Sequence, residues 1–139
     1  MPHPPSESNA SPFYRAAKER WKDSEVLVEK MRTTGSVYVA GYAVECLLKA
    51  LILVSVPRDK ERLILSQFRS AKAHDLRWLR KLYFEQGGAS FPLRAATDFD
   101  VVSTWTTSLR YQPATIDEDD ASDFLKSAKR MMEFLDQRI

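Results

Sequence analysis

The stretch from residue 35 to residue 56 constrains the fold most, because its middle is apolar on almost every side of a helix. It reads GSVYVAGYAVECLLKALILVSV. Only Glu45 and Lys49 are charged, and they lie four residues apart with the acid first, the favourable order for a pair on one helix face. A helix with so wide an apolar surface must be covered on several sides. The stretch therefore predicts a central helix around which the remaining segments pack.

The same stretch is long enough, at about 20 residues, to cross a bilayer. Crossing would place Glu45 and Lys49 near the midplane, at about 2.5–3.5 kcal/mol each. A buried helix in a soluble bundle avoids this penalty, so we expect no membrane-spanning segment. No stretch near the N-terminus pairs basic residues with an apolar run, as a secretory signal would. A cytoplasmic location is the resulting expectation.

The length of 139 residues, with 44% apolar and 29% charged residues, fits one globular domain with a proper core. Residues 1–11 contain three prolines among polar residues and predict a disordered N-terminal tail, so the domain should span 12–139. The net charge of +2 does not by itself indicate nucleic-acid or membrane binding.

Apolar residues recur three and four positions apart through most of the chain, which predicts helices. The first should begin near Ser11-Pro12, with an apolar face from Tyr14 to Met31. No alternating strand pattern is present. The sequence therefore predicts an all-α, up-and-down bundle of four to five helices. Its later helices should be a short one in 58–72, one opened by His74-Asp75 and ended by Gln86-Gly87-Gly88, one over 92–109, and a last one capped by Thr115 or Asp117.

Charge is unevenly distributed along the chain. Residues 58–81 hold eight basic residues against three acidic ones, and residues 98–123 hold seven acidic residues against Arg110 alone. This asymmetry could orient a partner or a symmetric dimer, or it could reflect two solvated faces. The basic stretch, which also contains Phe68 and Trp78, is the best candidate for a nucleic-acid surface.

The single cysteine, Cys46, lies inside the central apolar stretch. One cysteine allows no intramolecular disulfide and no zinc cluster. A thiol in such surroundings is expected to be a structural core residue rather than a nucleophile. We expect neither a metal nor a cofactor.

Three separated motifs together indicate a protein family. They are Tyr42-Ala-Val-Glu-Cys-Leu-Leu-Lys-Ala-Leu51 in the central stretch, His74-Asp75-Leu76 at the head of the third helix, and Leu109-Arg110-Tyr111 at the end of the fourth. Together, in this order and spacing, they resemble the HEPN domains of prokaryotes and eukaryotes. The resemblance covers about residues 13–138 and implies a bundle of four or five helices.

The resemblance implies two kinds of activity. Many HEPN domains are metal-independent ribonucleases, including toxins paired with a nucleotidyltransferase antitoxin, and use an Arg-x(4–6)-His motif at a dimer interface. Arginine would hold the scissile phosphate bidentately, and histidine would move the proton of the attacking 2′-hydroxyl. Other members lack the motif and are thought to bind nucleotides or RNA, or to act as non-catalytic partners.

The late position of the ribonuclease motif is vacant here, because no histidine follows Arg110. One literal match exists elsewhere, from Arg69 to His74. His74 is also accounted for by the family's histidine at the head of the third helix, where it would cap or hydrogen-bond the structure. Arg69 and His74 are therefore the only candidate catalytic pair, and the departure from the motif favours a non-catalytic domain.

The candidate ligand-binding residues are Glu45 and Lys49 on the central helix together with Arg110 and Tyr111. The four are expected to face one another, with Arg110 binding a phosphate and Tyr111 stacking on a base or donating its hydroxyl. The structural alternative is a partly buried Glu45–Lys49 pair that fixes helix register, with Arg110 satisfying helix carbonyls or pairing with Glu45.

Three hypotheses follow. The first is a non-catalytic, dimeric binding module for a nucleotide, RNA or a partner nucleotidyltransferase. The second is a metal-independent endoribonuclease toxin of a two-component system, and the third is a purely structural dimer or scaffold. A homodimer is expected in the first and third because a small bundle with so many aromatic and apolar residues has faces left to cover.

Overall fold

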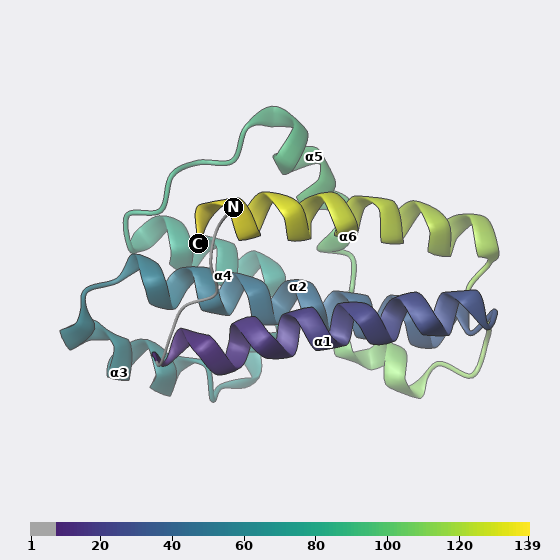
Figure 1. Ribbon diagram of the computed structural model, residues 1–139, viewed down its shortest axis with the longest axis horizontal. Coiled ribbons are helices and arrows are strands. Elements are labelled where there is room, and N and C mark those ends of the chain that lie inside the picture. Colours follow the sequence, from purple (N-terminus) through teal and green to yellow (C-terminus); the bar gives the residue numbers. More distant parts are fainter. Residues whose placement is uncertain (1–7) are drawn as a thin grey trace.

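The computed structural model describes residues 8–139, and within them the chain forms six α-helices, two short 3₁₀ helices and no strand (Figure 1). The all-α class predicted from the apolar periodicity is confirmed. In chain order the elements are α1 (Ala10–Glu29), α2 (Thr33–Ser55), α3 (Arg58–Gln67), η1 (Ala71–His74), α4 (Leu76–Glu85), α5 (Leu93–Val102), η2 (Thr107–Tyr111) and α6 (Glu118–Arg138).

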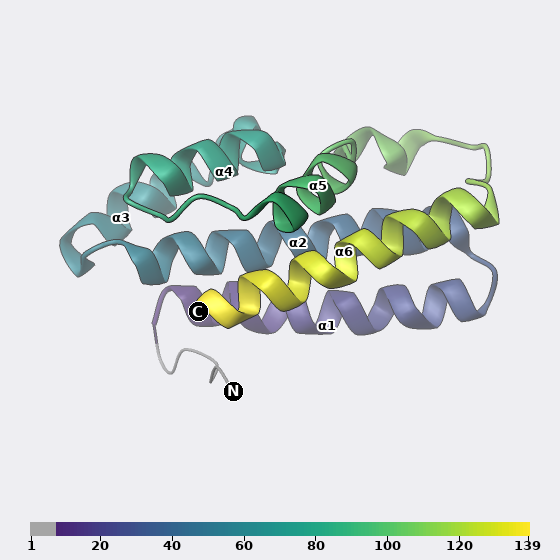
Figure 2. The same ribbon diagram turned by 90° about the horizontal axis from the view of Figure 1, so that it is seen from above.

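Helix α2 is the centre of the bundle, as its apolar sequence predicts. It packs against α1, α4, α6 and η2. Figures 1 and 2 together show α1 in front of α2, α6 above it, and α4 and η2 behind it. By length and composition α2 could cross a membrane, but most of its apolar surface is buried inside the protein. This burial is what the core helix of a bundle shows.

Helix α1 differs from its predicted bounds at both ends. Of the expected tail, residues 1–7 lie outside the described residues, and α1 begins at Ala10, where Ala10 and Ser11 are already buried. Ser11 is not the cap: its Oγ accepts from the Arg15 guanidinium at 2.7 Å within the helix. At the other end Met31 lies beyond the helix with φ of 61° and is 60% exposed, so its predicted place on the apolar face is wrong.

The predicted signals around α4 and α6 are confirmed. The Asp75 carboxylate caps α4 by accepting from the backbone N–H of Arg77 (2.9 Å) and of Trp78 (3.4 Å). The chain leaves α4 through Gly87, whose φ of 91° favours glycine. Asp117 caps α6 by accepting from Asp119 N–H at 3.1 Å.

The helix predicted over 92–109 is wrong in its second half, because α5 ends at Val102. The hydroxyls of Ser103 and Thr104 donate to the carbonyls of Asp100 (3.0 Å) and Val101 (2.8 Å), which competes with a continuing helix. The chain then turns, and Trp105 packs onto α2. Residues 107–111 follow as the separate turn η2.

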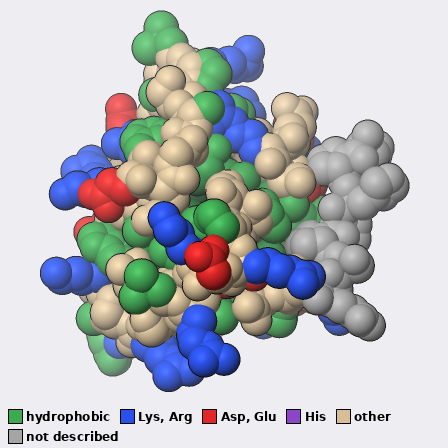
Figure 3. All heavy atoms as spheres, turned by 90° about the vertical axis from the view of Figure 1, so that its left-hand side faces the viewer, with side chains coloured by type: hydrophobic (Ala, Val, Ile, Leu, Met, Phe, Trp, Pro, Cys, Tyr) green, Lys and Arg blue, Asp and Glu red, His purple; other side chains and the backbone are tan. Residues whose placement is uncertain are grey.

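The basic stretch 58–81 forms α3, η1 and α4 at one end of the molecule. Figure 3 views that end and shows Lys and Arg side chains around its edge with apolar groups between them. The exposed basic residues are Arg58, Lys60, Arg62, Arg69, Lys72, Arg77 and Lys81.

Candidate binding site at the head of α4

A buried carboxylate on α2 organises the candidate site. Glu45 is only 2% exposed, and a buried carboxylate requires partners. Its Oε2 accepts from Lys49 Nζ at 2.9 Å, one turn further along the same helix. Its Oε1 lies 3.1 Å from Nδ1 of His74, which comes from η1. Glu45 thus joins a lysine of the core to a histidine at the surface.

Lys49 lies on the enclosed side of this arrangement. It is 5% exposed, and its Nζ lies 5.5 Å from the ring centroid of Phe68 and 5.9 Å from that of Phe13. Aromatic faces stabilise an ammonium at such distances. Lys49 is therefore surrounded by Glu45 and two phenyl rings rather than by solvent, as the structural alternative for this pair predicts.

His74 lies on the open side. Its side chain is 45% exposed, and Asp75, the next residue, caps α4. A carboxylate can only accept, so the hydrogen bond to Glu45 places the proton of a neutral imidazole on Nδ1 and leaves Nε2 free as an acceptor. The edge of the ring meets Tyr42 of α2, with centroids 6.2 Å apart. The imidazole is thus oriented by two residues of the central helix.

A shallow pocket of about 320 Å³ opens beside His74. Its lining combines one imidazole, one guanidinium and several hydroxyls. The Arg77 side chain crosses from α4 toward the end of α5, where its Nε donates to Ser103 Oγ at 3.3 Å. The lining residues are Ala71, His74, Asp75, Arg77, Ser103, Trp105, Thr106 and Thr107.

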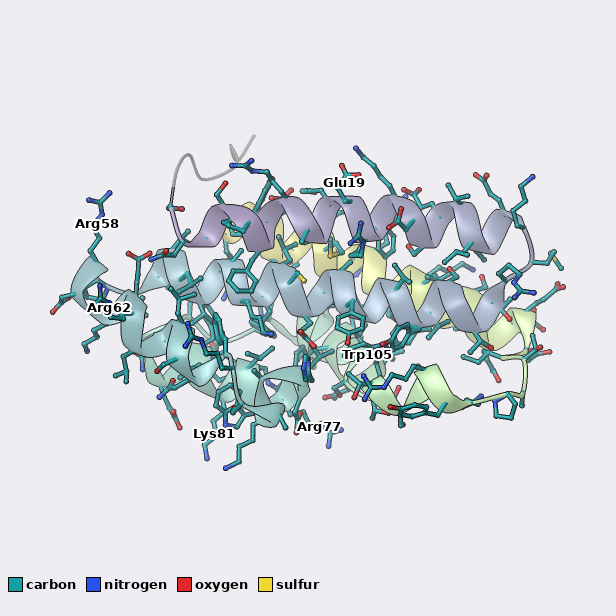
Figure 4. All side chains as sticks on the ribbon, turned by 90° about the horizontal axis from the view of Figure 1, so that it is seen from below. Glu19, Arg58, Arg62, Arg77, Lys81 and Trp105 are labelled. Carbon is teal, nitrogen blue, oxygen red and sulfur yellow. The ribbon has the colours of Figure 1, made fainter. Side chains whose placement is uncertain are left out.

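Trp105 closes the pocket on the side of α2. Figure 4 shows its side chain between α2 and η2, and Arg77 on α4 nearby. The indole is 3% exposed, and its Nε1–H donates to the Tyr38 carbonyl at 3.0 Å. It also meets the Tyr42 ring edge-on at 5.1 Å between centroids. The buried ring makes a rigid wall and offers no face for stacking.

Tyr42 carries the strongest shift among the tyrosines of the site. Its neighbour Tyr38, together with burial, raises the pKa of Tyr42 to about 12. The phenol therefore keeps its proton at neutral pH and is a donor, not a base.

Arg110 and Tyr111 do not lie at the end of a long fourth helix as predicted, because α5 ends at Val102. They belong to η2, and Tyr111 is 75% exposed with the Arg110 guanidinium 4.8 Å from its ring centroid. Within residues 8–139 neither makes a hydrogen bond or ion pair with Glu45 or Lys49, and His74 takes the place expected for Arg110. That the four residues form one ligand site stays a prediction, and η2, which carries Arg110 and Tyr111, packs against α2.

Neither Arg69 nor Cys46 lines the pocket beside His74. Arg69 is exposed in the turn after α3, and no hydrogen bond in the described part of the chain joins it to His74. Cys46 is half-buried, and burial raises the pKa of its thiol to about 11, as expected for an unreactive thiol. Over residues 8–139 no cluster of metal-ligating side chains occurs.

Sequence reasoning did not single out Arg77, and it missed the hydroxyls of Ser103, Thr106 and Thr107. The hydroxyl-rich run from Ser103 to Ser108 is the one signal that could have found them. Arg77 is one of the eight basic residues of the stretch 58–81, and nothing in the sequence distinguishes it from the other seven.

Comparison with known proteins gives one match. The sequence model of the HEPN domain family matches residues 10–138, nearly the whole chain. Neither a curated protein nor a solved structure matches the chain.

Proposed function

Because the chain belongs to the HEPN domain family, we propose that it is a non-catalytic binding module for a nucleotide or for RNA. The proposed site is the pocket beside His74. The observation that carries the proposal is the meeting of the His74 imidazole, the Arg77 guanidinium and three hydroxyls around one cavity. The Arg77 guanidinium and the hydroxyls of Thr106 and Thr107 are hydrogen-bond donors suited to phosphate oxygens, and arginine binds phosphate through two parallel N–H groups. The free Nε2 of His74 is an acceptor suited to a hydroxyl of the ligand's sugar.

The other residues have supporting roles in this proposal. Glu45 holds the imidazole in one orientation, and Lys49 balances the charge of Glu45 inside the core. Tyr111 is exposed and carries the Arg110 cation over one face, so a base of a bound strand could stack on its other face. In the proposed complex the phosphate binds in the pocket and the base stacks on η2.

The test is fluorescence anisotropy of the full chain with a labelled single-stranded RNA, with AMP and ATP as competitors. Arg77→Ala should weaken binding at least about tenfold, because a hydrogen bond to a charged group contributes about 1.5–3 kcal/mol. The matched control is Lys81→Ala, which removes the same charge from the same helix but from outside the pocket lining. Equal effects of the two substitutions would leave only general electrostatic attraction and reject the pocket.

One observation favours a second candidate, a metal-independent ribonuclease. A histidine held through Nδ1 by a buried carboxylate, with Nε2 free beside an arginine, is an arrangement that can transfer a proton. The purified chain is incubated with total RNA in EDTA. Intact RNA, or cleavage that persists in His74→Ala, rejects this candidate, whereas cleavage lost in His74→Ala rejects a non-catalytic module.

A further inference from the structure

A second surface lies away from the His74 pocket, in a groove of about 250 Å³ between α1 and α6. Its apolar floor consists of Trp21 and Val28 from α1 and Leu125 from α6, all of them half-buried. The lining residues on each helix are three or four positions apart, so they form one continuous face over about two turns. A half-covered apolar floor between two helices is a place where another helix can pack.

The two edges of the groove carry opposite charges. Glu25 is exposed on the α1 edge, and Lys126 and Lys129 are exposed on the α6 edge. None of the three takes part in an ion pair within residues 8–139. These charges are therefore available to a partner whose own charges follow the reverse order.

A second copy of this chain presents its basic α6 edge to the acidic α1 edge of the first copy if the two-fold axis of the dimer runs parallel to the groove. Helices α1 and α6 run in opposite directions (Figure 1). Rotation about such an axis lays α1 of one copy antiparallel on α6 of the other and places each Glu25 opposite Lys126 and Lys129 of the other copy. A two-fold axis across the groove would instead set Glu25 against Glu25, which is unfavourable.

We propose that this groove is a homodimer interface in which α1 and α6 of two copies form a four-helix layer. The contact is isologous, so the same three charges are satisfied twice. The apolar floor residues of both copies are covered at the same time. This inference specifies the surface of the homodimer expected from the sequence and does not depend on the proposed ligand.

The interface leaves the His74 pocket free. The pocket is built from α4, η1 and η2 and the turn after α5, which lie behind α2, whereas α1 lies in front of it and α6 above it (Figures 1 and 2). Two pockets would therefore open outward from the dimer, and each copy would bind its ligand without residues from the other. RNA binding and dimerisation can fail or succeed separately.

The experiment is light scattering coupled to gel filtration on the full chain and on two charge-reversal variants. The wild type should have twice the 16.0 kDa mass of one chain. Glu25→Lys alone, and Lys126→Glu with Lys129→Glu alone, should each raise the dimer dissociation constant more than about tenfold and run as monomers, because like charges then face each other. Circular dichroism checks that these surface variants keep the helical fold.

The decisive sample is an equimolar mixture of the two variants. In the mixed dimer both halves of the interface again pair opposite charges, so the mass should return to that of a dimer. Glu85→Lys, a matched reversal on α4, should remain dimeric. A monomeric wild type at the highest soluble concentration, variants that still dimerise alone, or a mixture that stays monomeric would each overturn the proposal.

Discussion

At Gly41 the missing side chain makes room for an indole. A Cβ at this position would overlap the Trp105 ring, which packs flat against α2 and hydrogen-bonds the Tyr38 carbonyl. Gly41→Ala should therefore displace Trp105 and lower the free energy of unfolding by about 1–3 kcal/mol, the usual effect of overpacking. Urea denaturation followed by tryptophan fluorescence measures this change.

Gly35 is the matched control for Gly41, because it lies in the same helix with free space around it. A Cβ there would meet only Leu27, at an ordinary 3.7 Å. Gly35→Ala should raise stability by about 0.5–1 kcal/mol through helix propensity. Equal stability of the two variants would show that Trp105 does not need the space at Gly41.

The buried pair of Glu45 and Lys49 gives a second residue-scale prediction. Lys49→Met leaves the Glu45 carboxylate with His74 alone and should cost about 3–5 kcal/mol of unfolding free energy. Adding Glu45→Gln removes the stranded charge, so the double variant should be more stable than Lys49→Met. The exposed pair of Glu19 and Lys22 serves as the reference, with an expected coupling within about 0.5 kcal/mol. A double variant no more stable than Lys49→Met would show that the loss in stability does not come from the unpaired Glu45 carboxylate.

At the scale of elements, the two aspartates that cap α4 and α6 allow the effect of a lost cap on stability to be told apart from its effect on RNA binding. Asp75 caps α4 beside the pocket, and Asp117 caps α6, whose cap is not part of the pocket lining. Alanine at either position should cost about 1 kcal/mol of stability. Only Asp75→Ala should also alter RNA binding, because it loosens the start of α4 between His74 and Arg77. Thermal unfolding and anisotropy on both variants test this, and equal binding by the two would place the ligand elsewhere.

The elements that the sequence predicts correctly are those with a long apolar period or a local terminating signal. The break at Val56-Pro57, the cap at Asp75 and the exit at Gly87 can all be found from neighbouring residues. The end of α5 was missed because its local signal, the hydroxyls of Ser103 and Thr104, is weak, and the packing of Trp105 at Gly41 joins distant parts of the chain. The prediction of one long helix therefore put Arg110 and Tyr111 at its end, whereas they belong to the separate turn η2.

At the scale of the whole molecule, the candidate site also combines a contact set by neighbouring residues with contacts between distant parts of the chain. The Glu45–Lys49 contact follows from a spacing of four on one helix. The third member, His74, is 29 residues from Glu45 and reaches it only because α3 and η1 return the chain to the middle of α2. Composition and periodicity do not indicate that the chain returns to α2 at His74. The Glu45–Lys49 contact could therefore be predicted from the sequence, whereas the pocket beside His74 could not.

Two ends of the chain are joined by a cluster on α1 and α6. Asp136 accepts from Tyr14 Oη at 2.9 Å and from Lys18 Nζ at 2.6 Å. Burial and the bond to Asp136 raise the pKa of Tyr14 above its usual value near 10.0. Burial alone would lower the pKa of Lys18, but the bond to Asp136 outweighs it and raises this pKa above 10.5. Both groups thus hold their protons more tightly in the folded state.

A group whose pKa is higher when folded adds stability below its unfolded pKa and loses it as the pH rises through the folded pKa. The contribution of this cluster should therefore be complete at pH 8 and should decline above about pH 10. Asp136→Asn should be less stable than the wild type by about 1 kcal/mol at pH 8, and the gap should shrink toward pH 11. Urea denaturation at both pH values measures it. In Asp23→Asn, the control, the exposed pair with Arg20 is lost, and because arginine does not titrate in this range the small gap should not change. A gap for Asp136→Asn that stays constant with pH would show that Tyr14 and Lys18 are not the groups it stabilises.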